Sequence, residues 1–221
     1  MEVFNKSGLY VIAGIKGVGK TSFLASLIEE YQKEDAQKYS LYCYNSAVGA
    51  NPPIISERLK IIELSELPIQ TGHIFLDSEW SKSDHGLATV IVDDFRTMLR
   101  TERFSHIELT REEKILYLLT RMKSLSDAYD IPVIITCGVD DDYIYGRLDK
   151  RPHISDIPDH KYIKAISDRI ILMHRDEMFT DSFEKKGITE FGVHSMPDAT
   201  YKDYRLVYIP ERDRYCRIEN C

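Results

Sequence analysis

Apolar runs of strand length alternate along this chain with stretches whose apolar positions recur at helical spacing. Residues 9–13, 88–92 and 132–136 are mostly apolar, which is typical of buried strands in a parallel sheet. Residues 22–28 and 111–129 instead place apolar side chains three and four positions apart, as an amphipathic helix does. This alternation predicts an α/β fold with a mostly parallel central sheet flanked by helices.

Shorter segments complete the predicted order of elements. A helix is expected from Pro52 and Pro53 through Leu59, because proline suits the first turn of a helix. The capping-box pattern of Thr110 and Glu113 marks the start of the longest helix, which is expected to end near Tyr129. Further strands are predicted at residues 41–44, 74–76, 170–173, 188–194, 205–209 and 215–218. The last three lie close together in the chain, which predicts an antiparallel extension of the sheet at its C-terminal end.

A glycine-rich motif separates the first predicted strand from the first predicted helix. Residues 14–21 read G-I-K-G-V-G-K-T and fit the phosphate-loop pattern G-x-x-x-x-G-K-[ST] without a mismatch. Glycines at such a turn let backbone N–H groups wrap a phosphate, and the helix N-terminus adds partial positive charge. The motif therefore predicts an ATP site in which Lys20 reaches the β- and γ-phosphates and serves catalysis. The predicted nucleotide-binding residues are Gly14, Lys16, Gly17, Val18, Gly19, Lys20, Thr21 and Ser22.

Two acidic residues follow the predicted strand at 88–92. Asp93 is expected to hold Mg²⁺ through its water shell, on the same sheet edge as the hydroxyl of Thr21. The simpler alternative is that Asp93 only ends the strand. Asp94 stands where other phosphate-loop ATPases place a glutamate base, so it is the candidate catalytic base of this chain. It is equally compatible with a cap on a helix that begins at Phe95.

Composition places the chain in one class and removes others. Its 221 residues suit a single α/β domain spanning 1–221. The chain has 29 basic and 36 acidic residues, a net charge of −7, so it exerts no general attraction on nucleic acid. Its longest apolar runs are too short to span a bilayer, and its first residues lack the apolar core of a secretory signal. The four cysteines show no zinc-ligand spacing, which favours a cytoplasmic protein with reduced thiols.

Several motifs beyond the phosphate loop resemble one family. The run D-K-R-P at 149–152 with S-D at 155–156, K-G-I-T-E at 186–190 and H-G-L at 85–87 are similar to motifs of DnaB-type replicative helicases. Asp168 falls on the family's D-A-D motif. Its Y-R-D-E motif is matched by Arg175, Asp176 and Glu177. The resemblance is to the family's RecA-like C-terminal motor domain and runs from Gly8 to Asn220. It implies a RecA-like P-loop NTPase fold, ATP binding, a ring of subunits, and single-stranded DNA in the central channel.

The same comparison shows that several functional positions of the family are replaced here. The family's catalytic glutamate corresponds to Ser46, and its phosphate-loop proline corresponds to Lys16. The glutamine that senses the γ-phosphate corresponds to Gly138, and the arginine three residues later corresponds to Asp141. The arginine-finger motif corresponds to Ser195 and Pro197. The family's collar and linker helix would precede residue 1. A monomeric or weakly associated chain is therefore expected.

Three functions fit these observations. The first is an ATP-binding, helicase-like protein that hydrolyses slowly or not at all and acts in DNA replication through a partner. The second is an active, minimal DNA-dependent ATPase or helicase that uses Asp94 as base and basic residues such as Lys202 or Arg205 in trans, with single-stranded DNA as ligand. The third is a loader or interaction protein that binds a complete replicative helicase or another replication protein, with ATP as a structural ligand.

Overall fold

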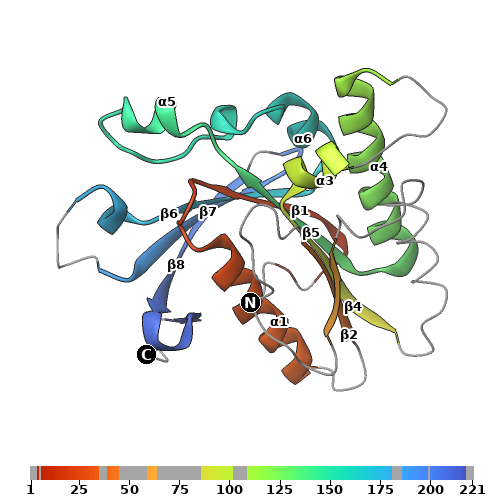
Figure 1. The fold of residues 1–221 in the computed structure, drawn as a ribbon, viewed down its shortest axis with the longest axis horizontal. Helices are drawn as coiled ribbons and strands as arrows, with labels where there is room; N and C mark the ends of the chain where they lie inside the picture. The colour runs from red at the N-terminus through yellow and green to blue at the C-terminus, as the bar shows by residue number, and fades with distance from the viewer. Residues whose placement is uncertain are drawn as a thin grey trace.

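The computed structural model describes residues 4, 6–34, 39–44, 59–63, 86–101, 109–180, 186–198 and 200–217. In this part of the chain nine strands form one sheet, ordered β3-β2-β4-β5-β1-β6-β7-β8-β9 (Figure 1). The strands are β1 (Gly8–Gly14), β2 (Tyr39–Tyr44), β3 (Leu59–Glu63), β4 (Leu87–Asp93), β5 (Pro132–Gly138), β6 (Arg169–His174), β7 (Ile188–Ser195), β8 (Thr200–Ile209) and β9 (Arg214–Arg217). The glycine-rich motif thus follows the central strand β1.

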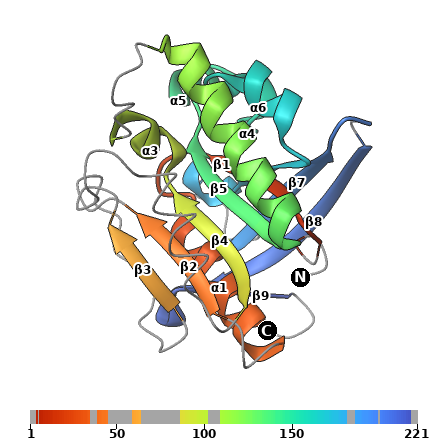
Figure 2. The same ribbon diagram turned by 90° about the vertical axis from the view of Figure 1, so that its right-hand side faces the viewer.

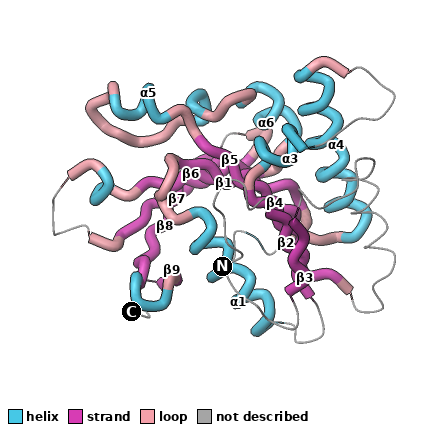
Figure 3. Tube along the Cα trace, viewed as in Figure 1, coloured by secondary structure: helices cyan, strands magenta, loops and turns pink. Residues whose placement is uncertain are grey.

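The sheet has a parallel part and an antiparallel part. Strand β1 pairs in parallel with β5 on one side and β6 on the other, and β2, β3 and β4 continue the parallel part. Strands β7, β8 and β9 run antiparallel to their neighbours. Figure 3 shows these strands as one twisted layer with helices on both sides. The predicted architecture, a mostly parallel central sheet flanked by helices with antiparallel C-terminal strands, is confirmed.

Helices cover both faces of the sheet. Helix α1 (Lys20–Glu34) lies on one face, where it packs against β1 and β9. On the other face lie α3 (Phe95–Thr101), α4 (Arg111–Tyr129) and α6 (His160–Ile166), with α5 (Asp141–Tyr145) beyond the end of β5 (Figure 2). All seven residues of β1 are buried, as expected for a strand covered on both faces. None of the helices among the described residues is long and apolar enough to cross a membrane.

Helix α4 forms as its sequence predicts. The hydroxyl of Thr110 accepts a hydrogen bond from the N–H of Glu113 at 3.3 Å, and the Glu113 carboxylate accepts one from the N–H of Thr110 at 2.8 Å. The helix ends at Tyr129, and Asp130 follows in the left-handed conformation with φ 51°. Its buried stripe consists of Ile115, Leu118, Leu119, Met122, Leu125 and Ser126. The apolar face therefore packs into the core, as the spacing indicates.

Two predicted boundaries are wrong. Leu59, expected to close a helix, instead begins strand β3 and pairs with Ser40 of β2. Pairing with β2 buries Leu59, and this tertiary contact outweighs the weak local preference read from the sequence. Strand β8 starts at Thr200 rather than at 205, because its exposed polar residues still pair with β7. The proposed helix start at 52–53 and the strand at 74–76 lie outside the described residues.

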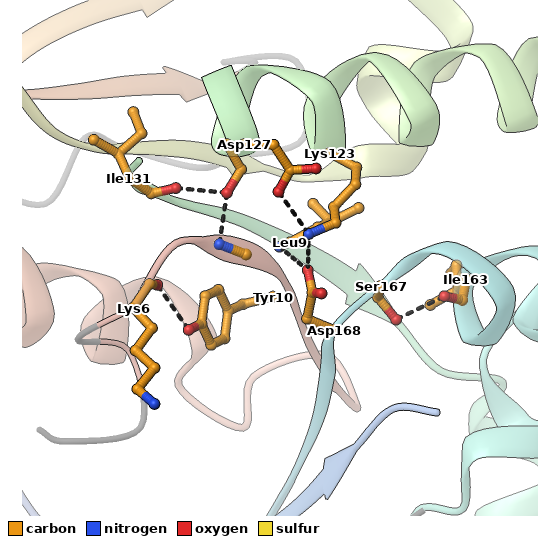
Figure 4. Close-up of polar contacts among 11 residues, drawn as sticks. Lys6, Leu9, Tyr10, Lys123, Asp127, Ile131, Ile163, Ser167 and Asp168 are labelled. Atoms are coloured by element: carbon orange, nitrogen blue, oxygen red, sulfur yellow. Dashed lines mark hydrogen bonds and ion pairs between the residues drawn. The ribbon is translucent and has the colours of Figure 1, made fainter. Parts of the chain in front are cut away.

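A polar cluster fixes the end of β1 that lies away from the glycine-rich loop (Figure 4). The N–H of Gly8 donates to the hydroxyl of Ser126 at 2.6 Å, and the N–H of Leu9 donates to the carboxylate of Asp168 at 2.7 Å. That carboxylate also pairs with the ammonium of Lys123 at 3.0 Å. Because α4 and the segment before β6 both hold this end, the register of β1 against its neighbours is set there.

Candidate nucleotide-binding site

The loop between β1 and α1 has the backbone shape that its glycines allow. Gly17 and Gly19 have φ values of 83° and 100°, in the left-handed region that other residues rarely adopt. A Cβ atom on Gly19 would lie 2.3 Å from the hydroxyl oxygen of Tyr215. Within the described residues, the N–H groups of Gly17 and Gly19 have no backbone partner. The loop can therefore offer N–H donors to an anion.

Lys20 begins α1 and turns back into the loop. Its ammonium donates to the carbonyl oxygens of Gly14 at 2.8 Å and Ile15 at 3.0 Å. Burial lowers the pKa of Lys20, while the carboxylates of Asp93 and Asp94 act in the opposite direction. A cation held inside a loop of N–H donors suits a polyphosphate, because the charge is placed before the ligand arrives.

Asp93 ends β4 and joins three elements through its carboxylate. One oxygen accepts hydrogen bonds from the hydroxyls of Thr21 at 2.8 Å and Tyr42 at 2.7 Å. The other accepts from the hydroxyl of Thr136 at 2.5 Å. Among the described residues no group of three His, Cys, Asp or Glu side chains could hold a metal. The role of Thr21 and Asp93 as Mg²⁺ ligands stays a prediction.

Asp94 sits beside this pair and caps the next helix. Its carboxylate accepts a hydrogen bond from the N–H of Arg96 at 2.9 Å, and its carbonyl accepts from the N–H groups of Thr97 and Met98 at 3.1 Å each. Burial raises the pKa of Asp94; Asp93 adds to this, whereas the Arg96 N–H and Lys20 oppose it. The capping geometry foreseen for Asp94 is thus present, and its role as a base stays a prediction.

Ser22, the last of the predicted nucleotide-binding residues, turns its hydroxyl toward the C-terminal strands. Its interaction with Asp213 helps to hold the pKa of that carboxylate below its usual range. The other seven predicted residues, 14 and 16–21, form the loop and the first turn of α1.

Tyr215 of β9 packs against the phosphate loop, and the sequence analysis did not identify it. Its hydroxyl donates to the carbonyl of Val18 at 3.2 Å, and its backbone N–H donates to the hydroxyl of Ser26 at 2.8 Å. Its ring also packs edge-on against Phe23. No local signal could have found this contact, because Tyr215 and Val18 are 197 positions apart.

The replaced family positions fall in different places. Gly138 ends β5 directly beside Gly14, and Asp141 follows as the first residue of α5. Ser195 pairs with Arg169 at the start of β6, so it lies at the opposite edge of the sheet from the loop. It can therefore not reach the phosphate loop of its own chain. Ser46 lies outside the described residues.

The strand order and the antiparallel extension define a RecA-like α/β domain. The chain belongs to the DnaB-like helicase C terminal domain family, whose model matches residues 55–217. It is similar to the replicative DNA helicase DnaB of Pasteurella multocida (strain Pm70), with 21% identity over 97% of this chain and 51% of the relative. The Geobacillus stearothermophilus DnaB is 20% identical over 98% of this chain and 54% of the relative. The chain thus spans about half the length of these relatives.

Solved structures show the same fold. A structure of an ATPase domain superposes with a TM-score of 0.73 and 16% identity, covering 96% of this chain and 85% of that one. A DnaB-like replicative helicase, described together with its interactions with primase, superposes with a TM-score of 0.75 and 16% identity. That match covers 97% of this chain and 58% of the helicase. At this level of identity the likeness establishes the architecture.

Proposed function

We propose that this chain is an ATP-binding motor-type domain with a role in DNA replication, which hydrolyses ATP slowly or not at all and acts through a partner. The observation that carries the proposal is the position of the Lys20 ammonium inside the loop, next to the Thr21–Asp93 pair. The DnaB-like family of the chain supports the link to replication.

The binding half of the proposal uses residues that are all present. The N–H groups of the loop and the start of α1 would surround the phosphates, and Lys20 would neutralise the β- and γ-phosphates. Thr21 and Asp93 would hold Mg²⁺, which supplies further positive charge to the phosphates. Hydrogen bonds from Tyr42 of β2 and Thr136 of β5 fix the orientation of the Asp93 carboxylate, which supports this assignment.

The proposal of slow hydrolysis rests on the replacement of the family's glutamine and arginine-finger residues by residues without an amide or a positive charge. Gly138 has no side chain to sense a γ-phosphate, and Ser195 and Pro197 carry no charge for a neighbouring site. Loss of an arginine finger alone costs about 10³–10⁵ in rate. The loop, Lys20 and the Mg²⁺ pair also serve binding of the ground state, so affinity for ATP survives while turnover falls.

The proposed partner is a replicative helicase or another replication protein. One structural neighbour is described with its interactions with primase, and several relatives are named replicative DNA helicases. Single-stranded DNA is a second candidate ligand, although a net charge of −7 works against phosphate binding.

An active ATPase that uses Asp94 is the second candidate function. The observation in its favour is that Asp94 lies close enough to Lys20 for each to shift the pKa of the other. Turnover at about 1–10³ per second that is abolished by Asp94→Asn would establish this function and refute slow hydrolysis. A loader that uses ATP only as a structural ligand would instead bind a complete replicative helicase in a pull-down experiment.

Calorimetry of the wild type and Lys20→Ala with Mg²⁺ and a non-hydrolysable ATP analogue tests the binding half. Lys20→Ala should lower the affinity strongly, because it removes a charge-assisted contact to the phosphates. Lys164→Ala on the exposed side of α6 is the matched control and should bind like the wild type. Undiminished affinity in Lys20→Ala would refute the site. Slow hydrolysis is tested by measuring steady-state ATP turnover with and without single-stranded DNA. The turnover is expected to be very slow in both cases.

A further inference from the structure

A cavity of about 520 Å³ lies between strands β6, β7 and β8 and the segment 149–155 that follows α5. This volume is within the usual range for a site that binds a small ligand. Pro152 and Leu172 give the cavity apolar surface, whereas Asp149, Tyr201 and Asp203 are exposed at its rim. A group from solvent can therefore enter it. Its lining residues lie outside the phosphate loop.

The register of the strands explains why a hollow forms here. Gly192 of β7 lies opposite Leu172 of β6 and Asp203 of β8, and it has no side chain to fill the space between them. A Cβ atom on residue 192 would lie 3.1 Å from both Cε2 and the hydroxyl oxygen of Tyr201, so the ring of Tyr201 leans over this glycine. Tyr201 is nevertheless 54% exposed, so part of its ring is open to solvent.

The segment that faces the strands is held in place by polar contacts. The guanidinium of Arg151 donates to one carboxylate oxygen of Glu190 on β7, at 2.6 and 3.1 Å. The N–H of His153 donates to the carboxylate of Asp156 at 2.6 Å, and Asp156 also forms an ion pair with Arg147. The cavity is therefore formed before any ligand arrives.

The charges of the lining favour a cation. The lining has three carboxylates, those of Asp149, Glu190 and Asp203, and one guanidinium, that of Arg151. Arg151 and Glu190 offset each other, so the carboxylates of Asp149 and Asp203 remain at the rim. Nε2 of the exposed His153 lies 3.6 Å from the Asp149 carboxylate. Carboxylates repel phosphate groups, which works against a nucleotide or single-stranded DNA as the occupant.

Tyr201 and Asp203 together form a surface suited to a planar cation. They are two residues apart on β8, so their side chains lie on the same face of the sheet, and the Tyr201 hydroxyl donates to the Asp203 carboxylate. The ring of His194 lies opposite, with its centroid 4.8 Å from that of Tyr201. Burial lowers the pKa of His194, so this ring adds no positive charge at neutral pH. A guanidinium can stack on such a ring and pair with the neighbouring carboxylate.

We propose that this cavity binds an arginine side chain of a partner protein, whose guanidinium stacks on Tyr201 and pairs with the carboxylate of Asp203. The inference rests on the proposed function in one respect, that the chain acts through a partner, and it needs no nucleotide at the phosphate loop. Arginine fits better than lysine, because its planar group stacks on a ring and contacts a carboxylate at the same time. The ammonium of lysine is instead a compact, strongly hydrated charge.

The probe for this site is a capped pentapeptide of glycine and serine with one arginine at its centre. Titration of the isotope-labelled chain with this peptide, followed by NMR, should shift the amide signals of residues 190–194 and 201–203 in a saturable way. A peptide with citrulline in place of arginine keeps the shape but has no charge, and it should bind at least about threefold more weakly. A lysine peptide should also bind more weakly than the arginine peptide.

Two variants of the cavity are compared with two matched controls. Tyr201→Ala and Asp203→Asn should each weaken binding of the arginine peptide about three- to tenfold. Tyr204→Ala removes another exposed tyrosine of β8, whose side chain lies on the opposite face of the sheet, and it should bind like the wild type. Asp142→Asn removes an exposed carboxylate of α5 and should also leave binding unchanged. A thermal melt of each variant shows whether it is folded.

Three results would overturn the proposal. The first is the absence of saturable shifts at residues 192, 201 and 203, and the second is peptide affinity in both Tyr201→Ala and Asp203→Asn within about twofold of the wild type. The third is a single-stranded oligothymidylate that shifts the same amides and displaces the peptide, because the occupant would then be nucleic acid. A non-hydrolysable ATP analogue added to the same sample reports separately on residues 14–22. Its failure to bind would refute the ATP site and leave the result for the cavity unchanged.

Discussion

Replacing Gly19 by alanine should destabilise the whole fold, because the phosphate loop and the C-terminal strand meet at this glycine. The new Cβ would lie 2.3 Å from the hydroxyl oxygen and 3.3 Å from Cζ of Tyr215. Tyr215 is only 7% exposed, and its ring packs against Phe23 and Phe191, so it has little room to move. The φ value of 100° at Gly19 adds backbone strain.

The magnitude follows from three contributions. Strain at a positive φ costs about 1–2 kcal/mol. Displacing Tyr215 overpacks the core, which costs about 1–3 kcal/mol, and weakens its hydrogen bond to Val18, which costs about 1 kcal/mol. Together these give about 3–6 kcal/mol, a large part of the roughly 5–15 kcal/mol by which a domain is stable. For a chain of this size, at about 2–4 °C per kcal/mol, the melting temperature should fall by about 6–24 °C.

Urea and thermal unfolding of purified Gly19→Ala measure this loss. Gly138→Ala is the matched control, because its Cβ would meet nothing within 4 Å and its backbone is not left-handed. The double variant Gly19→Ala/Tyr215→Phe removes the oxygen that makes the closest contact, so it should recover part of the lost stability. The strain at residue 19 remains in both variants.

A Gly19→Ala protein within about 1 kcal/mol of the wild type would refute this account. It would mean that β9 does not press against the loop as described. A double variant that is no more stable than the single one would show that the Tyr215 hydroxyl is not the obstacle, and that backbone strain accounts for the loss.

Two further predictions concern stability. Burial raises the pKa of Asp156, but hydrogen bonds from Arg147 and a backbone N–H outweigh burial and hold that pKa below its usual range. Because the folded pKa is depressed, the stabilisation is present above about pH 4 and is lost as the pH falls through the folded value; urea unfolding should show a steeper acid loss in the wild type than in Asp156→Asn. Ser126→Ala removes the partner of the buried N–H of Gly8 and should cost about 1–3 kcal/mol in urea unfolding, whereas exposed Ser155→Ala should cost less than about 0.5 kcal/mol.

The sequence predicts the parallel core of the fold well. The strands around residues 9–13, 88–92 and 132–136 are mostly apolar, because helices cover both faces of the sheet there. A capping box marks the start of α4, and the glycine-rich motif marks the join of β1 and α1. These signals are local, so they can be read without knowing which strands are neighbours.

What the sequence leaves open depends on contacts between distant residues. Strand β3 forms because it pairs with β2, and the sequence around Leu59 does not by itself predict this pairing. The support of the phosphate loop by Tyr215 also arises only when the sheet is assembled. The spacing of motifs along the chain predicts which residues reach the same edge of the sheet. It does not predict the hydrogen bonds that Asp93 and Asp94 accept, which only the structure shows.

The central position of β1 has a consequence for synthesis. Strand β1 is made first, but its neighbours β5 and β6 leave the ribosome more than a hundred residues later. At about 5–20 residues per second, this fully apolar strand has no partner for roughly ten seconds. Tyr215, whose hydroxyl contacts the phosphate loop, is made 197 residues after Val18 of that loop. Strand β1 therefore stays without its sheet neighbours during this interval, and the loop takes its final shape only after β9 has been made.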